Sequence, residues 1–446
     1  MLEKGGNVKE KKNQQTGAWN FRSSGSPHSG KFPPKFAKPQ HTPTPQPAMR
    51  LPLALRPSLV AFAIFLVGGI RAEPFSFPLD NGFPFPNETA LEELFTRAGG
   101  NFTNAPLAPR FDDDSLTSWK LQAFNEFMEV AFFTQLIANI TNNVTGYDLA
   151  SGAFSSPAER DYVLSSLSTI QAQEEMHAYN ANDAVRYFTN GSHIYPCTYV
   201  FPVFTFASAV DFAQTMTDMY IGLLANIQQR TARNLGSDSN SIVYVLAQAL
   251  GQEGQQSGWF RSLRKLAPSA EPFLTTSTRE FHMGWMQHWI VEGSCPNMEY
   301  IPLPILKPVT LTGVSIGDAS HTGNVTMVAP GPVNPDTQRL AFVNGALVPT
   351  VVPFKIIRQT CEPGVGNGTR DHHRQRVLRG GGGDKSDDGC VASTTEIVAD
   401  MPFFHNVMQG LIVMAIVEKP DDDAPYITAQ DVTDATVYGP GLLEYT

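Results

Sequence analysis

The sequence predicts a mainly α protein, in which a bundle of four long helices with a shorter fifth helix precedes a smaller β-rich C-terminal domain. Between residues 115 and 292 the apolar residues recur with helical spacing. Beyond Cys295 and Pro296, short β-branched runs alternate with Gly, Pro, Asn and Asp, which is typical of strands and turns. The chain has 446 residues, of which 42% are hydrophobic, enough for two domains with substantial cores.

The helical bundle is expected to cover residues 115–297. An acidic cluster that begins at Asp112 is a good N-terminal cap for the first helix, and Pro157 is well suited to the first turn of the second. A link of about a dozen residues after the second helix suits a bundle with one crossover connection. The expected helices cover residues 115–142, 157–188, 202–233, 240–266 and 270–291.

The β-rich domain is expected to cover residues 298–446 and to resemble a small sandwich. Its low-complexity segment, residues 362–389, predicts a disordered loop. We expect one disulfide, Cys361–Cys390, to close this loop and another, Cys197–Cys295, to tie the bundle, although four cysteines allow three pairings. The expected strand segments are Val309–Ile316, Asn324–Val328, Arg339–Val352, Phe354–Ile357 and Leu411–Val417.

The N-terminal part contains a secretory signal. Residues 49–72 have a basic start, an apolar run and a small residue at the end, which is the pattern of a signal peptide. A single-pass anchor is the alternative, but the uncharged run Pro57–Ile70 is shorter than the roughly 17–25 residues of a spanning helix. Residues 1–48 are either a disordered extension or a gene-model artefact that precedes a true start at Met49, and residues 73–114 are expected to form an extended lead-in.

Charge and sequons agree with secretion. The formal net charge is −10, and residues 73–446 hold 21 Lys and Arg against 40 Asp and Glu, a net −19. Such an acidic chain is a poor nucleic-acid binder, because that function requires a basic face. The expected glycosylation sites are Asn87, Asn101, Asn143, Asn190, Asn324 and Asn367.

The helices contain few charges, so the few that occur are informative. Glu126 and Glu129 are the only charged residues between Leu121 and Tyr147. A helix that is apolar almost all round is buried, and a buried carboxylate costs several kcal/mol unless it is paired, protonated or bound to a cation. The i, i+3 spacing places both carboxylates on one side of the helix.

The other long helices follow the same pattern. The second carries Glu174 and His177 at i, i+3, and the fourth has a single charge, Glu253, between Ser241 and Phe260. Isolated acids and an imidazole on four apolar helices predict a carboxylate and histidine centre for iron or manganese, mononuclear or dinuclear, with no bound metal as the alternative. The candidate ligands are Glu126, Glu129, Glu174, His177, Gln214, Glu253 and Gln256.

Residues 115–297 resemble the ferritin-like domain of a fungal secreted family of stress-response and late sexual-development proteins. Four segments carry the resemblance: Asn125–Gln135, Gln173–Ala178, Gly251–Arg261 and Ile290–Pro296. The resemblance implies a ferritin-like bundle, a secreted location and a fungal source, but no defined reaction. It also implies that the metal ligands are Glu126, Glu174, His177 and Glu253.

The sequence departs from that ligand pattern at two places. Gln256 stands where a histidine is expected, and the third helix offers Gln214 or Asp211 where a glutamate is expected. An amide is a weak, neutral ligand, so these departures weaken the second metal position.

Two functions follow. The first is a secreted metal-binding protein with a degenerate centre, and the alternative is a non-enzymatic cell-wall or extracellular structural protein with a vestigial site. In both, we expect no nucleic-acid partner, no membrane span after signal cleavage, and association with the cell wall or extracellular matrix.

Overall fold

The computed structural model describes residues 72–315, 323–362, 377–379, 391–402, 408–421 and 424–445. All of them belong to one compact unit that spans residues 56–446. The predictions for the extension, for nearly all of the signal peptide and for most of the 362–389 loop, with Asn367 and Cys390, lie outside the described residues. Among the described residues, no helix is both long and apolar enough to cross a bilayer.

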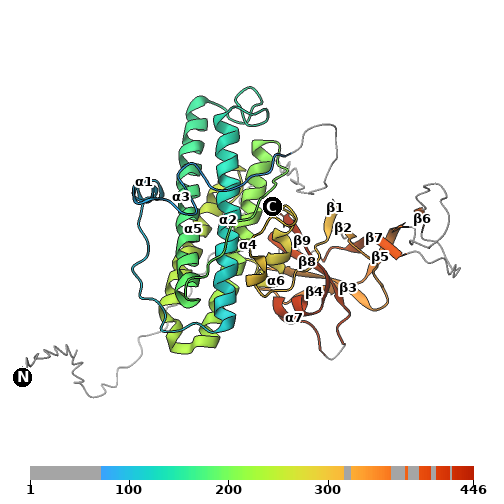
Figure 1. Cartoon of the computed structure of the whole chain (residues 1–446). Helices are drawn as coiled ribbons and strands as arrows, with labels where there is room; N and C mark the ends of the chain where they lie inside the picture. Colours follow the sequence, from blue (N-terminus) through green and yellow to red (C-terminus); the bar gives the residue numbers. More distant parts are fainter. Residues whose placement is uncertain are drawn as a thin grey trace, which may run out of the picture. The chain divides into compact units, whose positions relative to one another are not determined.

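Four long helices and three shorter ones occur in the described ranges (Figure 1). They are α1 (Glu88–Ala98), α2 (Asp113–Thr141), α3 (Pro157–Phe188), α4 (Phe206–Leu235), α5 (Asn240–Leu263), α6 (Arg279–Met286) and α7 (Ala429–Asp434). The starts of the long helices follow local chemistry. The Asp112 carboxylate caps α2 and Ser156 caps α3 just before Pro157, while Thr205 forms a capping box at the start of α4.

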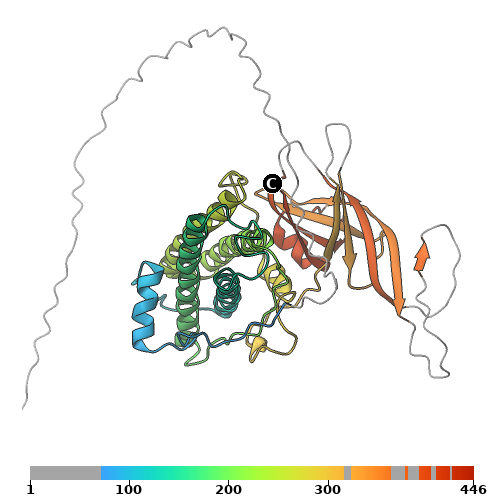
Figure 2. The same ribbon diagram turned by 90° about the horizontal axis from the view of Figure 1, so that it is seen from above.

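The long helices pack as two pairs, α2 with α3 and α4 with α5, and α1 lies against α3 (Figure 2). The fifth predicted helix is much shorter than the sequence suggested. Only α6, Arg279–Met286, is helical in the segment 270–291. Conversely, the predicted extended lead-in contains α1, which Asn87 caps and which ends at Gly99 in a left-handed conformation.

The strands form two antiparallel sheets. In the described ranges, the larger has the order β1-β2-β7-β5-β6 and the smaller has the order β4-β3-β8-β9. The strands are β1 (Thr310–Ser315), β2 (Asn324–Ala329), β3 (Gln338–Asn344), β4 (Thr350–Val352), β5 (Phe354–Glu362), β6 (Val377–Arg379), β7 (Val391–Asp400), β8 (Gly410–Glu418) and β9 (Thr436–Tyr445).

Strand β8 is buried on both faces, because the smaller sheet contributes to two hydrophobic cores. Leu411 and Val413 belong to the core that includes the helices, whereas Ile412 and Met414 belong to the core of the two sheets. This alternation follows from the two-residue period of a strand. A continuous apolar run such as Leu411–Val417 is typical of a strand covered on both sides.

The predicted fold class, a mainly α four-helix bundle with a small β-rich appendage, is wrong. The structure is a helical part followed by two antiparallel sheets of five and four strands, and one face of the smaller sheet belongs to the helical core. Helical periodicity reveals which face of a helix is buried but not what covers it. The packing of α6 against β9 and the two-sided burial of β8 could therefore not be read from the sequence.

Asp114 ties the start of α2 to two other helices. Its carboxylate accepts hydrogen bonds from Arg230 on α4 at 2.6 Å, from Asn234 at 2.8 Å, and from Arg279 on α6 at 2.8 Å. Although burial acts in the opposite direction, the bonds and charges of Arg230 and Arg279 lower the pKa of Asp114 to about 2. Ionised Asp114 therefore stabilises the folded state.

We expect Asp114→Asn to lower the free energy of unfolding at pH 7 by about 2–3 kcal/mol, because it leaves Arg279 buried without its partner. The stabilisation is present above the ordinary pKa of about 3.8 and is lost as the pH falls through about 2, so the two proteins should converge well below pH 2. Denaturant unfolding at both pH values checks this. Asp113→Asn, on the exposed side of the same turn, is the control, and an equal loss in both variants would contradict the assignment.

Candidate metal centre

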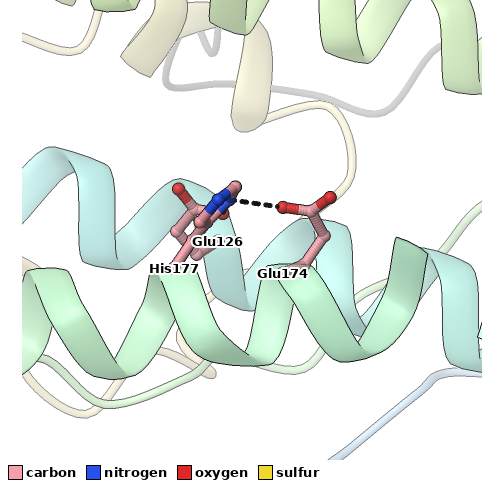
Figure 3. Close-up of side chains that lie close together, drawn as sticks. All are labelled: Glu126, Glu174 and His177. Carbon is pink, nitrogen blue, oxygen red and sulfur yellow. Dashed lines mark hydrogen bonds and ion pairs between the residues drawn. The ribbon is translucent and has the colours of Figure 1, made fainter. Parts of the chain in front are cut away.

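Two helices bring together the three residues at the heart of the site. Glu126 comes from α2, and Glu174 and His177 come from adjacent turns of α3 (Figure 3). His177 Nδ1 lies 2.9 Å from Glu174 Oε2 and 3.8 Å from Glu126 Oε2. Each residue can offer one ligand atom such that all three atoms lie within 4.8 Å of one another.

A second group of carboxylates adjoins the first. Glu129, Glu174 and Glu253 also place one oxygen each within 4.8 Å of one another, so Glu174 belongs to both groups. Glu253 Oε1 on α5 lies 3.3 Å from His177 Nδ1. Five candidate ligands from three helices therefore surround one small volume, and the four carboxylates are completely buried or nearly so.

A shell of hydrogen bonds holds these acids. The hydroxyl of Tyr220 donates to Glu126, and the amide of Gln256 donates to Glu174. Asn125 Nδ2 donates to Glu129 Oε2 at 2.9 Å, and its own oxygen lies 2.7 Å from Nε2 of His282. Gln256 thus holds a candidate ligand, Glu174, through its amide nitrogen. Its Oε1 is buried without a hydrogen-bond partner.

Electrostatics of the centre are dominated by burial and by carboxylates that repel each other. Burial raises the pKa values of Glu126 and Glu129 well above the ordinary range, and neighbouring carboxylates add to the effect. Burial and the charge of Glu174 raise the pKa of Glu253 to about 7. Burial alone would lower the pKa of His177, but Glu174 and Glu126 outweigh it and raise that pKa well above its usual value.

Several polar atoms in this cluster lack partners. Oε2 of Glu126, Oε1 of Glu129 and both oxygens of Glu253 are buried without a hydrogen bond. Unpaired buried polar atoms cost about 1–3 kcal/mol each, and charged ones cost more. Four acids that face a single imidazole have a deficit of positive charge, which protons or a cation can supply.

The structure places Gln214 outside this cluster. Its Nε2 donates to Glu444 Oε1 on β9 at 2.8 Å, and its Oε1 accepts from Arg264 at 2.6 Å. Asp211, the other candidate on α4, pairs with Arg264 at 2.5 Å. The contribution of α4 to the centre is Tyr220, six residues beyond Gln214, and not an amide or carboxylate ligand.

Sequence reasoning missed Tyr220, Asn125 and His282 as members of the site. His282 is fully buried, and burial lowers its pKa to about 3. A neutral His282 beside Asn125 orients the amide that holds Glu129. Tyr220 follows the apolar pattern of α4, so only its closeness to Glu126 reveals its role.

A pocket of about 270 Å³ leads to the centre and includes Glu126, His177 and Tyr220 in its lining. Residues that follow α1, among them Phe102, form part of its wall. Helix α1 is attached to α3 by the buried Glu175, which accepts hydrogen bonds from Arg97 at 3.0 Å and from Asn81 at 2.8 Å. Glu175 is thus committed to a structural contact away from the centre.

The remaining predicted sites lie apart from the acids. Cys197 and Cys295 form a disulfide, which links the segment before α4 to the segment after α6. The sequon Asn101 lines the pocket and is exposed, so a glycan attached there would stand at its mouth. Asn87, Asn143 and Asn190 are exposed at helix ends or in connections, and Asn324 begins β2.

Comparison with known proteins adds no assignment: no protein-family model matches the chain, and no curated protein matches it.

Proposed function

We propose that this protein binds iron or manganese at the centre formed by Glu126, Glu129, Glu174, His177 and Glu253. The observation that carries the proposal is the meeting of five donor side chains, four of them acids, in one buried volume. Oxygen donors with one imidazole are a donor set that suits these metals.

The spacing of the donors fits an ion. With metal–oxygen bonds of about 2.1 Å, neighbouring ligand atoms of an octahedral ion lie about 3 Å apart and opposite ones about 4.2 Å apart. The distances from His177 Nδ1 to the oxygens of Glu174, Glu253 and Glu126 are 2.9, 3.3 and 3.8 Å. Glu174, which belongs to both donor groups, is placed to bridge two ions.

Neighbouring side chains hold the proposed ligands in position before an ion binds. The bonds from Tyr220 and Gln256 orient Glu126 and Glu174, and Oε2 of Glu253, which is buried without a hydrogen-bond partner, offers free lone pairs. When bound, iron or manganese would supply a Lewis acid or a redox couple, and the pocket would give small molecules access to it.

Metal analysis tests the proposal. Protein purified without chelators, or refolded with Fe²⁺ or Mn²⁺ and then dialysed, should retain one to two ions per chain by elemental analysis. A parallel refolding with Zn²⁺ shows whether the donor set prefers iron or manganese to zinc. The absence of all three metals from every preparation would remove the proposal.

We expect Tyr220→Phe to weaken Mn²⁺ binding about tenfold, because partners of metal ligands typically contribute 10–100-fold to affinity. The variant keeps the ring that packs in the core and removes only the hydroxyl that donates to Glu126. Calorimetric titration of protein from which a chelator has removed metal measures the change in affinity. An unchanged affinity in a folded variant would contradict the role given to this hydroxyl.

The second candidate function is that of a structural extracellular protein with a vestigial site. The hydrogen bonds that Glu126, Glu129 and Glu174 already accept favour it, because they satisfy part of the acids without metal. It predicts that Glu126→Gln changes the stability of the protein but not its metal content. The metal-binding proposal predicts a loss of metal as well.

We further propose that the protein is secreted, and that its role belongs to stress response or sexual development in a fungus. The support is the signal-like segment 49–72, the exposed sequons and the resemblance of four sequence segments to that secreted family. N-terminal sequencing of protein from culture medium should begin near Glu73. Peptides from residues 1–48 in that material would contradict the start at Met49.

A further inference from the structure

The pocket above the centre has a composition that selects a class of ligand. Its apolar wall combines aromatic, thioether and aliphatic side chains from the segment after α1 and from α2 to α5: Phe102, Trp119, Met176, Tyr220, Leu246 and Ala249. At about 270 Å³ it is close to the lower end of the roughly 300–1,000 Å³ typical of ligand pockets. This lining suits a small flat molecule, because aromatic faces and edges pack well against one another.

Hydrogen-bonding groups in the wall lack partners. Trp119 Nε1 and Gln122 Nε2 are donors, and Gln252 Oε1 is an acceptor, and all three are buried without a hydrogen bond. Trp119 and Gln122 are each only 5% exposed. A ligand that both accepts and donates hydrogen bonds would satisfy these groups once their side chains turn towards it, and such groups reject an analogue that lacks the matching polar atom.

The charge of the wall argues for a neutral ligand. No Lys or Arg occurs among the lining residues, so no such side chain would form an ion pair with an anion. The carboxyl of Glu126 would also lie close to it. The other polar lining groups near the centre are amides and hydroxyls. Glu126 is the one carboxylate among the lining residues, and an organic cation would have to compete for it with His177 and with the proposed metal ion.

We infer that this pocket binds a small neutral aromatic molecule that carries a hydroxyl group, with its ring against Trp119 and Ala249 and its hydroxyl towards Gln122 and Gln252. This inference deepens the proposed function, since the ligand would lie beside the metal centre. The pocket itself is present without metal, so binding can be measured independently of metal content.

Four probes that share a methylphenyl ring test the inference by calorimetry on protein from which a chelator has removed metal. They are 4-methylphenol, toluene, 4-methylbenzoate and 4-methylbenzylamine. We expect 4-methylphenol to bind at least tenfold more tightly than each of the others. Equal binding of toluene would show that the cavity selects only for apolar surface. Preference for the acid or the amine would show that it selects a charged ligand. Either result overturns the inference.

Variants locate the binding. Ala249→Phe fills the pocket and should weaken 4-methylphenol at least tenfold, whereas Ala247→Phe, an exposed position on the same helix outside the pocket, should not. Gln122→Leu keeps the volume and should bring 4-methylphenol and toluene within about twofold. Binding that survives Ala249→Phe in a folded protein would overturn the inference.

Metal retention is measured separately, on protein refolded with Fe²⁺ or Mn²⁺ before any chelator is added. Tight binding of 4-methylphenol by a protein that retains no metal after this refolding would support the pocket and contradict only the proposed function. Retained metal without binding of any probe would support the proposed function and contradict only the inference about the pocket.

Discussion

Replacing Glu174 by glutamine should weaken Mn²⁺ binding about a thousandfold, which corresponds to about 4 kcal/mol. Glu174 is the one carboxylate that belongs to both donor groups, so the change removes a charged ligand from each. It also leaves the Gln256 amide facing another amide, in place of the oxygen to which it now donates. Calorimetric titration of chelated variant and wild type measures the affinity.

Glu175→Gln is a matched control for this change. Glu175 is the next residue on α3, is equally buried, and contacts Arg97, Asn81 and Gln171 and none of the candidate ligands. It should lose stability, because Arg97 loses its partner, but keep the affinity for Mn²⁺ within about threefold of wild type. If both variants lose metal equally, a general loss of structure and not the removal of a ligand explains the result.

The metal-free protein should become less stable as the pH rises. The ordinary pKa of glutamate is 4.5, and burial with repulsion from Glu174 raises that of Glu253 to about 7 in the folded state. Between these values the folded state holds a proton that the unfolded state has lost. The stabilisation is therefore complete below pH 4.5 and declines as the pH rises through about 7, by about 3 kcal/mol in total.

Unfolding of chelated protein by denaturant at pH 5 and pH 8 measures this change. Glu253→Gln should flatten the profile by about 3 kcal/mol, because an amide does not titrate. Glu92→Gln, an exposed carboxylate on α1, should reproduce the wild-type profile. Added Mn²⁺ should restore stability at pH 8 in the wild type, since an ion replaces the protons and its binding strengthens with pH. A wild-type stability that increases from pH 5 to pH 8 would contradict the account.

Charge scarcity was sufficient to select most of the side chains that lie together in the candidate centre. Glu126, Glu174, His177 and Glu253 are isolated in apolar helices, and an isolated charge in an apolar helix must find a buried partner. Their convergence in the structure follows from the pairing of α2 with α3 and from the position of α5.

The features that the sequence could not reveal depend on contacts between residues that are far apart along the chain. Gln214 has the same local pattern as the ligands, but Glu444 in the last strand and Arg264 after α5 hold it elsewhere. The same long-range packing explains the error in fold class. Apolar runs identify strands such as β8, but only the contacts show that one face of β8 belongs to the helical core.

Metal binding among Glu126, Glu174 and His177 can be observed by anomalous diffraction at the manganese edge, from crystals grown with Mn²⁺. We expect an anomalous peak about 2.1–2.3 Å from Glu174 Oε2 and from the imidazole of His177. Crystals with bound Mn²⁺ elsewhere and no anomalous peak among these three residues would contradict it.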